Sequence, residues 1–274
     1  MSHRLINIFF FFVLTYIFVL FCDQNDHLRL FWAFSFAVSF CLIAFLLNWL
    51  TLDGSLSAIL LGTIAFGLGG IAGAATILGF FITSSLISQD IKENAGDQVL
   101  DSRRFRRDGY QVWANGFWFT FFVILWFVSE ESFFLIAAVG SVATATSDTW
   151  ATELGGNFRP GKTVLVTTLK ETEPGTDGGI SIKGLVAGLI GAAVIAGIFL
   201  LTSPEFSWTI IIAISIASFL GSLLDSYLGA TIQGRSFYMD FVKADYKFVI
   251  DNNMVNWLST GAGALLTIIL IQFT

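Results

Sequence analysis

Two aspartates stand inside long apolar stretches of this chain, where ionisable side chains are rare. Asp148 closes the stretch 132–149, and Asp225 lies in the stretch 207–230 among serine and glycine residues. An unpaired carboxylate in apolar surroundings is costly, so both residues are functional candidates. Because Mg²⁺ prefers oxygen ligands, we predict that Asp148 and Asp225 hold Mg²⁺ and act in catalysis together with Glu153. The alternative is that each carboxylate caps a helix or bridges a helix pair.

A glycine-rich segment follows these acids and precedes the next apolar stretch. Glycines allow successive backbone N–H groups to converge on an anion, and the start of the following helix adds a dipole that favours phosphate. Lys170 and Lys183 flank the segment and could neutralise phosphate charge. We predict a phosphate-binding loop, with Lys170 as a catalytic candidate; by glycine content alone, a flexible solvated loop is the alternative. The segment consists of Pro174, Gly175, Thr176, Asp177, Gly178 and Gly179.

A second glycine-rich segment matches a phosphate-binding motif by its letters. Residues 156–163 fit the pattern G-x-x-x-x-G-K-[ST]. A P-loop of this kind follows a buried strand and opens a helix. Here the segment follows an apolar membrane stretch, and residues 164–168 (V-L-V-T-T) are typical of extended chain. We therefore predict that this segment is not a P-loop.

Two further polar groups stand where apolar stretches begin. We predict that the group near residue 107 binds an anionic substrate and that the asparagines near residue 252 orient phosphate oxygens. The alternatives are that each polar group caps a helix or bridges a helix pair, and that the arginines near residue 107 fix the topology or contact anionic lipid. The first group consists of Arg107, Asp108, Gln111 and Asn115, and the second of Asn252, Asn253 and Asn256.

Helices in a membrane must position these residues. The chain is 55% hydrophobic and 12% charged, whereas soluble domains are about 45–50% apolar and about 25% charged. The sequence predicts an all-α fold, a polytopic transmembrane helical bundle with about nine membrane segments (seven to nine). The third and fourth segments are short and could form a re-entrant pair or one broken helix. The apolar segments are 5–22, 30–49, 54–71, 74–88, 112–129, 132–149, 184–203, 207–230 and 254–273.

The basic residues predict the orientation. With the N-terminus in the cytoplasm and nine crossings, every lysine and arginine except Arg29 falls in a cytoplasmic segment, as the positive-inside rule requires. The long connections 89–111, 150–183 and 231–253 then share the cytoplasmic side, where we expect the active site. We predict a multi-pass protein of the cell (inner) membrane or of a thylakoid-type membrane. Residues 1–22 imitate a signal peptide but lack a cleavage site, so we expect a retained first span.

Composition also excludes some classes and leaves others open. The net charge of -6 argues against nucleic acid as a partner. Cys22 and Cys41 have no metal-ligand spacing, and both histidines lie outside the proposed site. A transporter or lipid flippase of an anionic substrate remains the alternative to an enzyme, although no internal repeat is evident. A structural membrane subunit is the third class, and the sequence leaves the oligomeric state open.

At these residues the chain resembles a known family, the integral-membrane proteins called domain of unknown function 92. The resemblance runs from about residue 30 to the C-terminus, and we divide the chain into an N-terminal span with a short outer loop (1–29) and a family membrane domain (30–274). The sequence departs from the family at Gly109, often Trp, and at Asp177, often Asn. Matching stretches include L-D-G-S-L-S-A-I-L-L-G-T (52–63), R-D-G-Y-Q-V-W-A-N-G (107–116), S-D-T-W-A-T-E-L-G (147–155), P-G-T-D-G-G-I-S (174–181), G-S-L-L-D-S-Y-L-G-A-T-I-Q (221–233) and N-N-M-V-N-W-L-S (252–259).

The resemblance implies a function. The family includes phytyl-phosphate kinases, which act in phytol salvage for tocopherol and related quinones. A fainter similarity extends to membrane enzymes that use CTP. The implied activity is a Mg²⁺-dependent phosphotransferase that converts an isoprenoid alcohol monophosphate, such as phytyl phosphate, to the diphosphate with a nucleoside triphosphate, expected to be CTP. The implied partners are the prenyl phosphate and membrane lipid.

Overall fold

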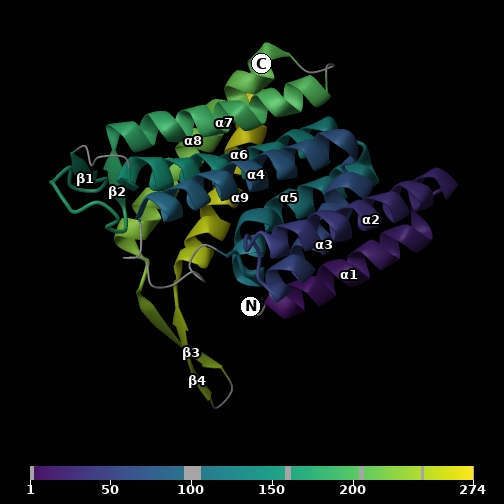
Figure 1. Cartoon of the computed structure of the whole chain (residues 1–274), viewed down its shortest axis with the longest axis horizontal. Coiled ribbons are helices and arrows are strands. Elements are labelled where there is room, and N and C mark those ends of the chain that lie inside the picture. The colour runs from purple at the N-terminus through teal and green to yellow at the C-terminus, as the bar shows by residue number, and fades with distance from the viewer. Residues whose placement is uncertain (1–2, 96–105, 158–161, 204–206, 242–243, 274) are drawn as a thin grey trace.

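The computed structural model describes residues 3–95, 106–157, 162–203, 207–241 and 244–273. Within these ranges the chain forms nine helices and two short antiparallel β-hairpins (Figure 1). The helices are α1 (His3–Leu20), α2 (Gln24–Leu46), α3 (Leu52–Gly67), α4 (Gly70–Ala95), α5 (Gly109–Ser129), α6 (Ser132–Asn157), α7 (Ile182–Thr202), α8 (Trp208–Thr231) and α9 (Asn252–Ile271). The strands are β1 (Thr163–Leu165), β2 (Gly179–Ser181), β3 (Ser236–Phe241) and β4 (Ala244–Val249).

Helix α6 forms the core of the bundle. It packs against α4, α5, α7, α8 and α9, and every residue from 135 to 147 is buried. Its buried residues are mostly small (Ala, Gly, Ser and Thr), which allows neighbouring helices to approach closely. Thr144 of α6 lies between two glycines: a Cβ added to Gly221 would lie 2.8 Å from Thr144 Cγ2, and one added to Gly263 would clash with Thr144 Oγ1. Small residues thus bring α6, α8 and α9 together one turn from Asp148 and Asp225.

The helices alternate in direction, so that nine helix ends meet at one end of the bundle. At that end, the Asp53 carboxylate at the start of α3 accepts a hydrogen bond from Gly109 N at the start of α5 (2.9 Å). Ser259 near the start of α9 likewise bonds Asp225 near the end of α8. At the other end, Arg29 Nε donates to the carbonyl of Gly67 at the end of α3 (2.7 Å). The prediction that the long connections lie together at one end is confirmed for their described residues.

The third and fourth segments form a helical hairpin. A turn at Leu68–Gly69 joins α3 to α4, and Gly70 there has a φ of 63°, a value that favours glycine. Trp49 Nε1, just before α3, donates to Gln89 Oε1 near the end of α4 (3.1 Å). The two helices are therefore separate and antiparallel, and the alternative of one broken helix is wrong.

The exterior of the bundle is apolar. Seven of the described helices are long and apolar enough to cross a membrane, all except α3 and α6. Large side chains such as Phe12 of α1 and Leu201 of α7 are 65% and 84% exposed, as expected for residues that face lipid. This confirms the predicted helical membrane bundle of seven to nine segments. The side of the membrane that each end faces remains a prediction from the basic residues.

The two hairpins lie in the long connections and were not predicted. β1 pairs with β2, with Val164 opposite Ile180, so the start of the segment 164–168 is extended as expected. No helix follows residues 156–163 directly, which confirms the rejection of the P-loop; residues 158–161 lie outside the described residues. β3 pairs with β4 and projects away from the bundle (Figure 1).

Helix α1 packs on α3 and α5 by specific contacts. The Phe10 ring stacks on that of Trp113, with centroids 4.8 Å apart, and Trp113 Nε1 donates to Asn7 Oδ1 (2.6 Å). His3 Nε2 lies 3.8 Å from Asp53 Oδ2. The first span is therefore part of the described bundle, and the division of the chain at residue 29 stays a prediction.

Candidate functional site

A polar cavity of about 310 Å³ lies where the helix ends meet. Its walls are the ends of α4, α6 and α8, the starts of α5 and α9, and the glycine-rich loop before α7. Most of the predicted site residues line it: Arg107, Gln111, Asn115, Asp148, Glu153, Pro174–Gly179, Asp225, Asn252 and Asn256. The structure thus brings together residues that are up to about 150 positions apart in the chain.

Asp148 and Asp225 are in direct contact. Their carboxyl groups lie within hydrogen-bonding distance of each other. Ser259 Oγ donates to Asp225 Oδ2 (2.7 Å). With its amide nitrogen turned toward the acceptors, Asn256 also donates to Asp225 Oδ2 (3.1 Å) and to the Asn252 carbonyl (3.2 Å). Two adjoining carboxylates repel each other unless a proton or a cation lies between them, so this pair is suited to binding a cation.

The oxygen groups fit Mg²⁺ bound together with a phosphate ligand. Mg²⁺ is commonly held by one or two carboxylates plus substrate phosphates, without a full protein cage. Among the described residues, no three His, Cys, Asp or Glu side chains converge to hold a metal ion. The pair could therefore supply two ligands, and the remaining positions would fall to water and phosphate oxygens.

Among the described residues that line this cavity, Arg107 is the only one with a basic side chain. The lining also includes four acidic residues, Asp148, Glu153, Asp177 and Asp225. The Arg107 guanidinium donates to Ser85 Oγ through Nη1 (2.6 Å). Desolvation lowers the pKa of Arg107 to about 10, and the Glu153 carboxylate opposes this shift. The side chain therefore stays cationic at neutral pH. Glu153 Oε1 in turn accepts a hydrogen bond from Ser88 Oγ (3.2 Å).

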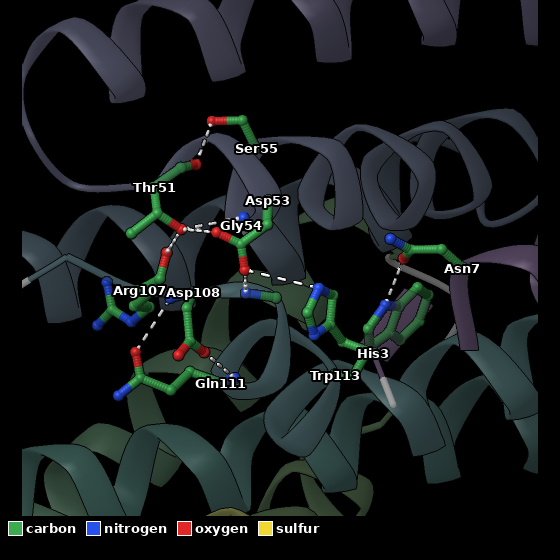
Figure 2. A network of polar contacts seen from close by, with 11 residues as sticks. His3, Asn7, Thr51, Asp53, Gly54, Ser55, Arg107, Asp108, Gln111 and Trp113 are labelled. Carbon is green, nitrogen blue, oxygen red and sulfur yellow. Dashed lines mark hydrogen bonds and ion pairs between the residues drawn. The ribbon is translucent and has the colours of Figure 1, made fainter. Parts of the chain in front are cut away.

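The backbone of Arg107 is held by the connection between α2 and α3. Arg107 N donates to the Trp49 carbonyl (2.9 Å), and its carbonyl accepts from Thr51 N (3.1 Å). A Cβ at Gly54 would collide with the Arg107 carbonyl, so a glycine is needed there. Figure 2 shows the contacts of Thr51 with Arg107 and with Asp53, and the approach of His3 to Asp53. Asp53 also accepts from Gly109 N.

Three predicted residues do not line the cavity. Asp108 caps α5: its Oδ1 accepts from Gln111 N (2.9 Å) and Gln111 Oε1 accepts from Asp108 N (3.2 Å), as Figure 2 shows. Lys170 is exposed in the connection before the glycine-rich loop, and Asn253 is half-buried in the first turn of α9. Their predicted roles in substrate binding, catalysis and phosphate binding stay predictions.

The glycine-rich loop and the residues that follow it contact α8, the end of β1 and α6. Gly178 has a φ of 76° and packs on α8, where an added Cβ would lie 2.7 Å from the Ser226 carbonyl. The Gly178 carbonyl accepts from Val166 N (3.0 Å) beyond β1. Ser181 Oγ accepts from Gly184 N (3.2 Å), which caps α7, and donates to the Gly155 carbonyl of α6 (3.3 Å). The loop therefore lines the cavity and is packed on α8 at Gly178, whereas Pro174–Asp177 are exposed. Its role in phosphate binding stays a prediction.

Sequence reasoning missed several residues around the site. Ser88 and Gln233 line the cavity, and Ser259 bonds the acid pair. Thr51 N donates to the Arg107 carbonyl, and Gly54 leaves room for that carbonyl. Gly54 belongs to the stretch 52–63, which carried only the family resemblance, and Thr51 directly precedes it. Serines and glycines are common in membrane helices, so only their positions in space single them out.

The fold and the site define a multi-pass helical membrane protein with an acidic polar cavity at one end of its bundle. The profile of the family of integral membrane proteins DUF92 matches residues 35–264. The chain belongs to this family.

The relatives cover most of the chain. It is 29% identical over 220 residues to an uncharacterized membrane protein of Methanocaldococcus jannaschii, covering 80% of this chain and 84% of the relative. It is 28% identical over 239 residues to Protein VTE6, chloroplastic, of Arabidopsis thaliana (83% and 67%). It is 30% identical over 219 residues to an uncharacterized membrane protein of Synechocystis (76% and 77%). No solved structure matches this chain.

Proposed function

We propose that this protein is a membrane-embedded kinase that phosphorylates an isoprenoid alcohol monophosphate, such as phytyl phosphate, to the diphosphate. The donor is a nucleoside triphosphate, which we expect to be CTP. The observation that carries the proposal is the contact of Asp148 with Asp225 in a polar cavity that also contains Arg107 and a glycine-rich loop. The resemblance to phytyl-phosphate kinases supports the same reaction, with a role in tocopherol and quinone biosynthesis.

In this proposal each wall of the cavity has a separate task. Arg107 binds the phosphate of the lipid, with Gln111 and Asn115 beside it. The loop Pro174–Gly179 binds the donor phosphates through the backbone N–H groups of Gly175, Asp177 and Gly178, because those of Thr176 and Gly179 donate within the chain. Asn252 and Asn256 orient phosphate oxygens. Asp148 and Asp225 hold Mg²⁺. When bound, this ion would supply positive charge that offsets the negative charge developing in the transition state.

The chemical step needs no strong general base. An oxygen of the ionised prenyl monophosphate attacks the terminal phosphorus of the donor, and the bond from that phosphorus to the oxygen of the next phosphate breaks. The products are the prenyl diphosphate and the nucleoside diphosphate. This agrees with a cavity whose described lining contains no histidine. The protein would act mainly by positioning and by charge stabilisation.

The test is an assay with the purified full-length chain, Mg²⁺, CTP radiolabelled in its γ-phosphate, and phytyl or geranylgeranyl monophosphate. We expect a labelled prenyl diphosphate, detected by chromatography and mass spectrometry. ATP, GTP and UTP are assayed in parallel to identify the donor. Absence of diphosphate with every nucleotide and prenyl phosphate tested would reject the kinase. If the protein moves prenyl phosphate across the membrane of a vesicle and forms no diphosphate, the result would instead support the transporter or flippase.

A pair of glycine variants tests the loop. Gly178→Ala places a Cβ at positive φ and against Ser226 and Ala230 of α8, so we expect the loop to shift and the KM for the nucleotide to rise at least about tenfold. Gly175→Ala is the matched control, because its φ of 84° is similar but no atom lies within 4 Å of the added Cβ. Strain at positive φ costs about 1–2 kcal/mol in either variant. A wild-type nucleotide KM in Gly178→Ala would contradict a role for the packed loop.

A further inference from the structure

A second cavity adjoins the first and is apolar. It has a volume of about 80 Å³ and is lined by side chains of α2, α3, α4 and α5. Arg107, Gln111 and Asn115 line both cavities. We call this second cavity the α2–α5 groove. The α2–α5 groove therefore begins at these three shared residues, which lie between it and the polar cavity.

The polar end of the groove carries a positive charge on aromatic rings. The Arg107 guanidinium carbon lies 5.7 Å from the ring centre of Phe80 and 5.4 Å from that of Phe81, and both rings line the groove. Cation–π contacts of this kind hold a guanidinium at an apolar boundary. An apolar groove that ends at a cation matches a ligand with an anionic head and an apolar tail.

The groove is narrow. Ala37 and Gly62 line it, and a Cβ added to Gly62 would lie 3.3 Å from Ala37 Cβ. Its enclosed volume holds only part of a long hydrocarbon chain. Phe36 lines the groove and is 49% exposed on the apolar exterior. The rest of a chain can therefore extend into the surrounding lipid, and the groove is suited to one chain, not the paired chains of a phospholipid.

We propose that the α2–α5 groove binds the hydrocarbon tail of a single-chain prenyl monophosphate and places its phosphate at Arg107, facing the acid pair. This inference rests on the proposed function and locates the lipid substrate within it. The far end of the groove then contacts only tails that are long enough to reach it. Ala74 lines that end of α4, six residues before Phe80, or about 9 Å along the helix.

The direct test is photolabelling of the full-length chain with a geranylgeranyl monophosphate analogue that carries a diazirine on the second isoprene unit from the phosphate, the part of the tail that the groove encloses. We expect labelled peptides from α2–α5 at the groove, and competition by unlabelled geranylgeranyl monophosphate. Label confined to other helices would overturn the proposal, and so would label that competes with phosphatidylglycerol but not with prenyl phosphate. The wild-type label map requires no substitution, so it decides the question even if a variant fails to fold.

The variant test is Ala74→Phe, which fills the far end of the groove. We expect binding of geranylgeranyl monophosphate to weaken about tenfold, because burial of about two methylenes is lost, while binding of the short dimethylallyl monophosphate changes little. The matched control is Ala193→Phe, at an exposed position of α7 outside both cavities. Equal weakening for both tail lengths, or for both variants, would contradict the tail site.

The two proposals can fail separately. Label in the groove without any diphosphate product would retain the lipid site and reject the kinase. Diphosphate product with label elsewhere would retain the kinase and reject the groove.

Discussion

Replacement of Asp148 or Asp225 by asparagine is expected to lower diphosphate formation at least about a hundred-fold, since removal of one preorganised electrostatic group commonly costs 10²–10³ in rate. Asparagine keeps the shape of the side chain and removes the charge that would hold Mg²⁺. Ser259 and Asn256, which donate hydrogen bonds to Asp225, can still donate to an amide oxygen. We therefore expect the fold to persist and the loss to be chemical. The measurement is the rate of product formation as a function of Mg²⁺ concentration, together with thermal unfolding of each variant.

Asp23→Asn is the matched control for these variants. Asp23 is an exposed N-cap of α2 at the opposite end of the bundle, and asparagine caps a helix as well as aspartate does. We expect this variant to keep full activity. If Asp148→Asn and Asp225→Asn also keep full activity, the pair is a structural contact between α6 and α8, and the Mg²⁺ assignment is wrong. A loss of activity that coincides with unfolding would point to the same structural role.

Replacement of Arg107 by alanine is expected to raise the KM for prenyl monophosphate about 10- to 100-fold, because a hydrogen bond to a charged group contributes about 1.5–3 kcal/mol. Arg107→Lys should recover only part of this loss, since an ammonium group cannot reproduce the planar, paired donors of a guanidinium. The KM for the nucleotide should change much less, because the proposal assigns the donor to the glycine-rich loop. The measurement is a pair of substrate titrations, one for each substrate.

The neighbouring Arg106 provides the control for loop structure. Its guanidinium donates to the Leu50 carbonyl (2.7 Å from Nη2) and lies over the Phe45 ring, and Arg106 does not line either cavity. Arg106→Lys should alter stability more than the KM for prenyl phosphate. Equal increases in this KM for Arg106→Lys and Arg107→Lys would contradict a contact between Arg107 and phosphate. They would show instead that the KM depends on the position of the segment before α5.

The sequence predicted the membrane helices well, because each helix depends on a local run of apolar residues. All nine predicted apolar segments correspond to helices, although their bounds differ by several residues. α6 illustrates the difference: its polar end at residues 147–157 continues the helix beyond the predicted end at 149. β1 and β2 were missed because three residues each are too few to show an alternation. β3 and β4 have an ordinary strand length, and the alternation in β4 (A-D-Y-K-F-V) was overlooked.

For the candidate site, the residue types were more informative than the assigned roles. Asp148 and Asp225 were selected because charge is rare in apolar helices, and the structure brings them into contact. Asp108 was selected as a substrate-binding residue and caps a helix, the alternative that sequence reasoning had weighed for each polar group. Lys170 is near the loop in sequence and does not line the cavity. Proximity along a connection does not determine where its side chains point.

The sequence by itself determined that this is a helical membrane protein of the DUF92 family with its polar residues concentrated in the long connections. These properties follow from local hydrophobicity and charge, which each segment carries independently of the others. Only the tertiary structure decided that α6, α8 and α9 bring two carboxylates into contact through Thr144, Gly221 and Gly263. Likewise, only the structure decided that Arg107 separates a polar cavity from an apolar groove. Contacts of this kind depend on side chains packed from distant segments, which no local pattern encodes.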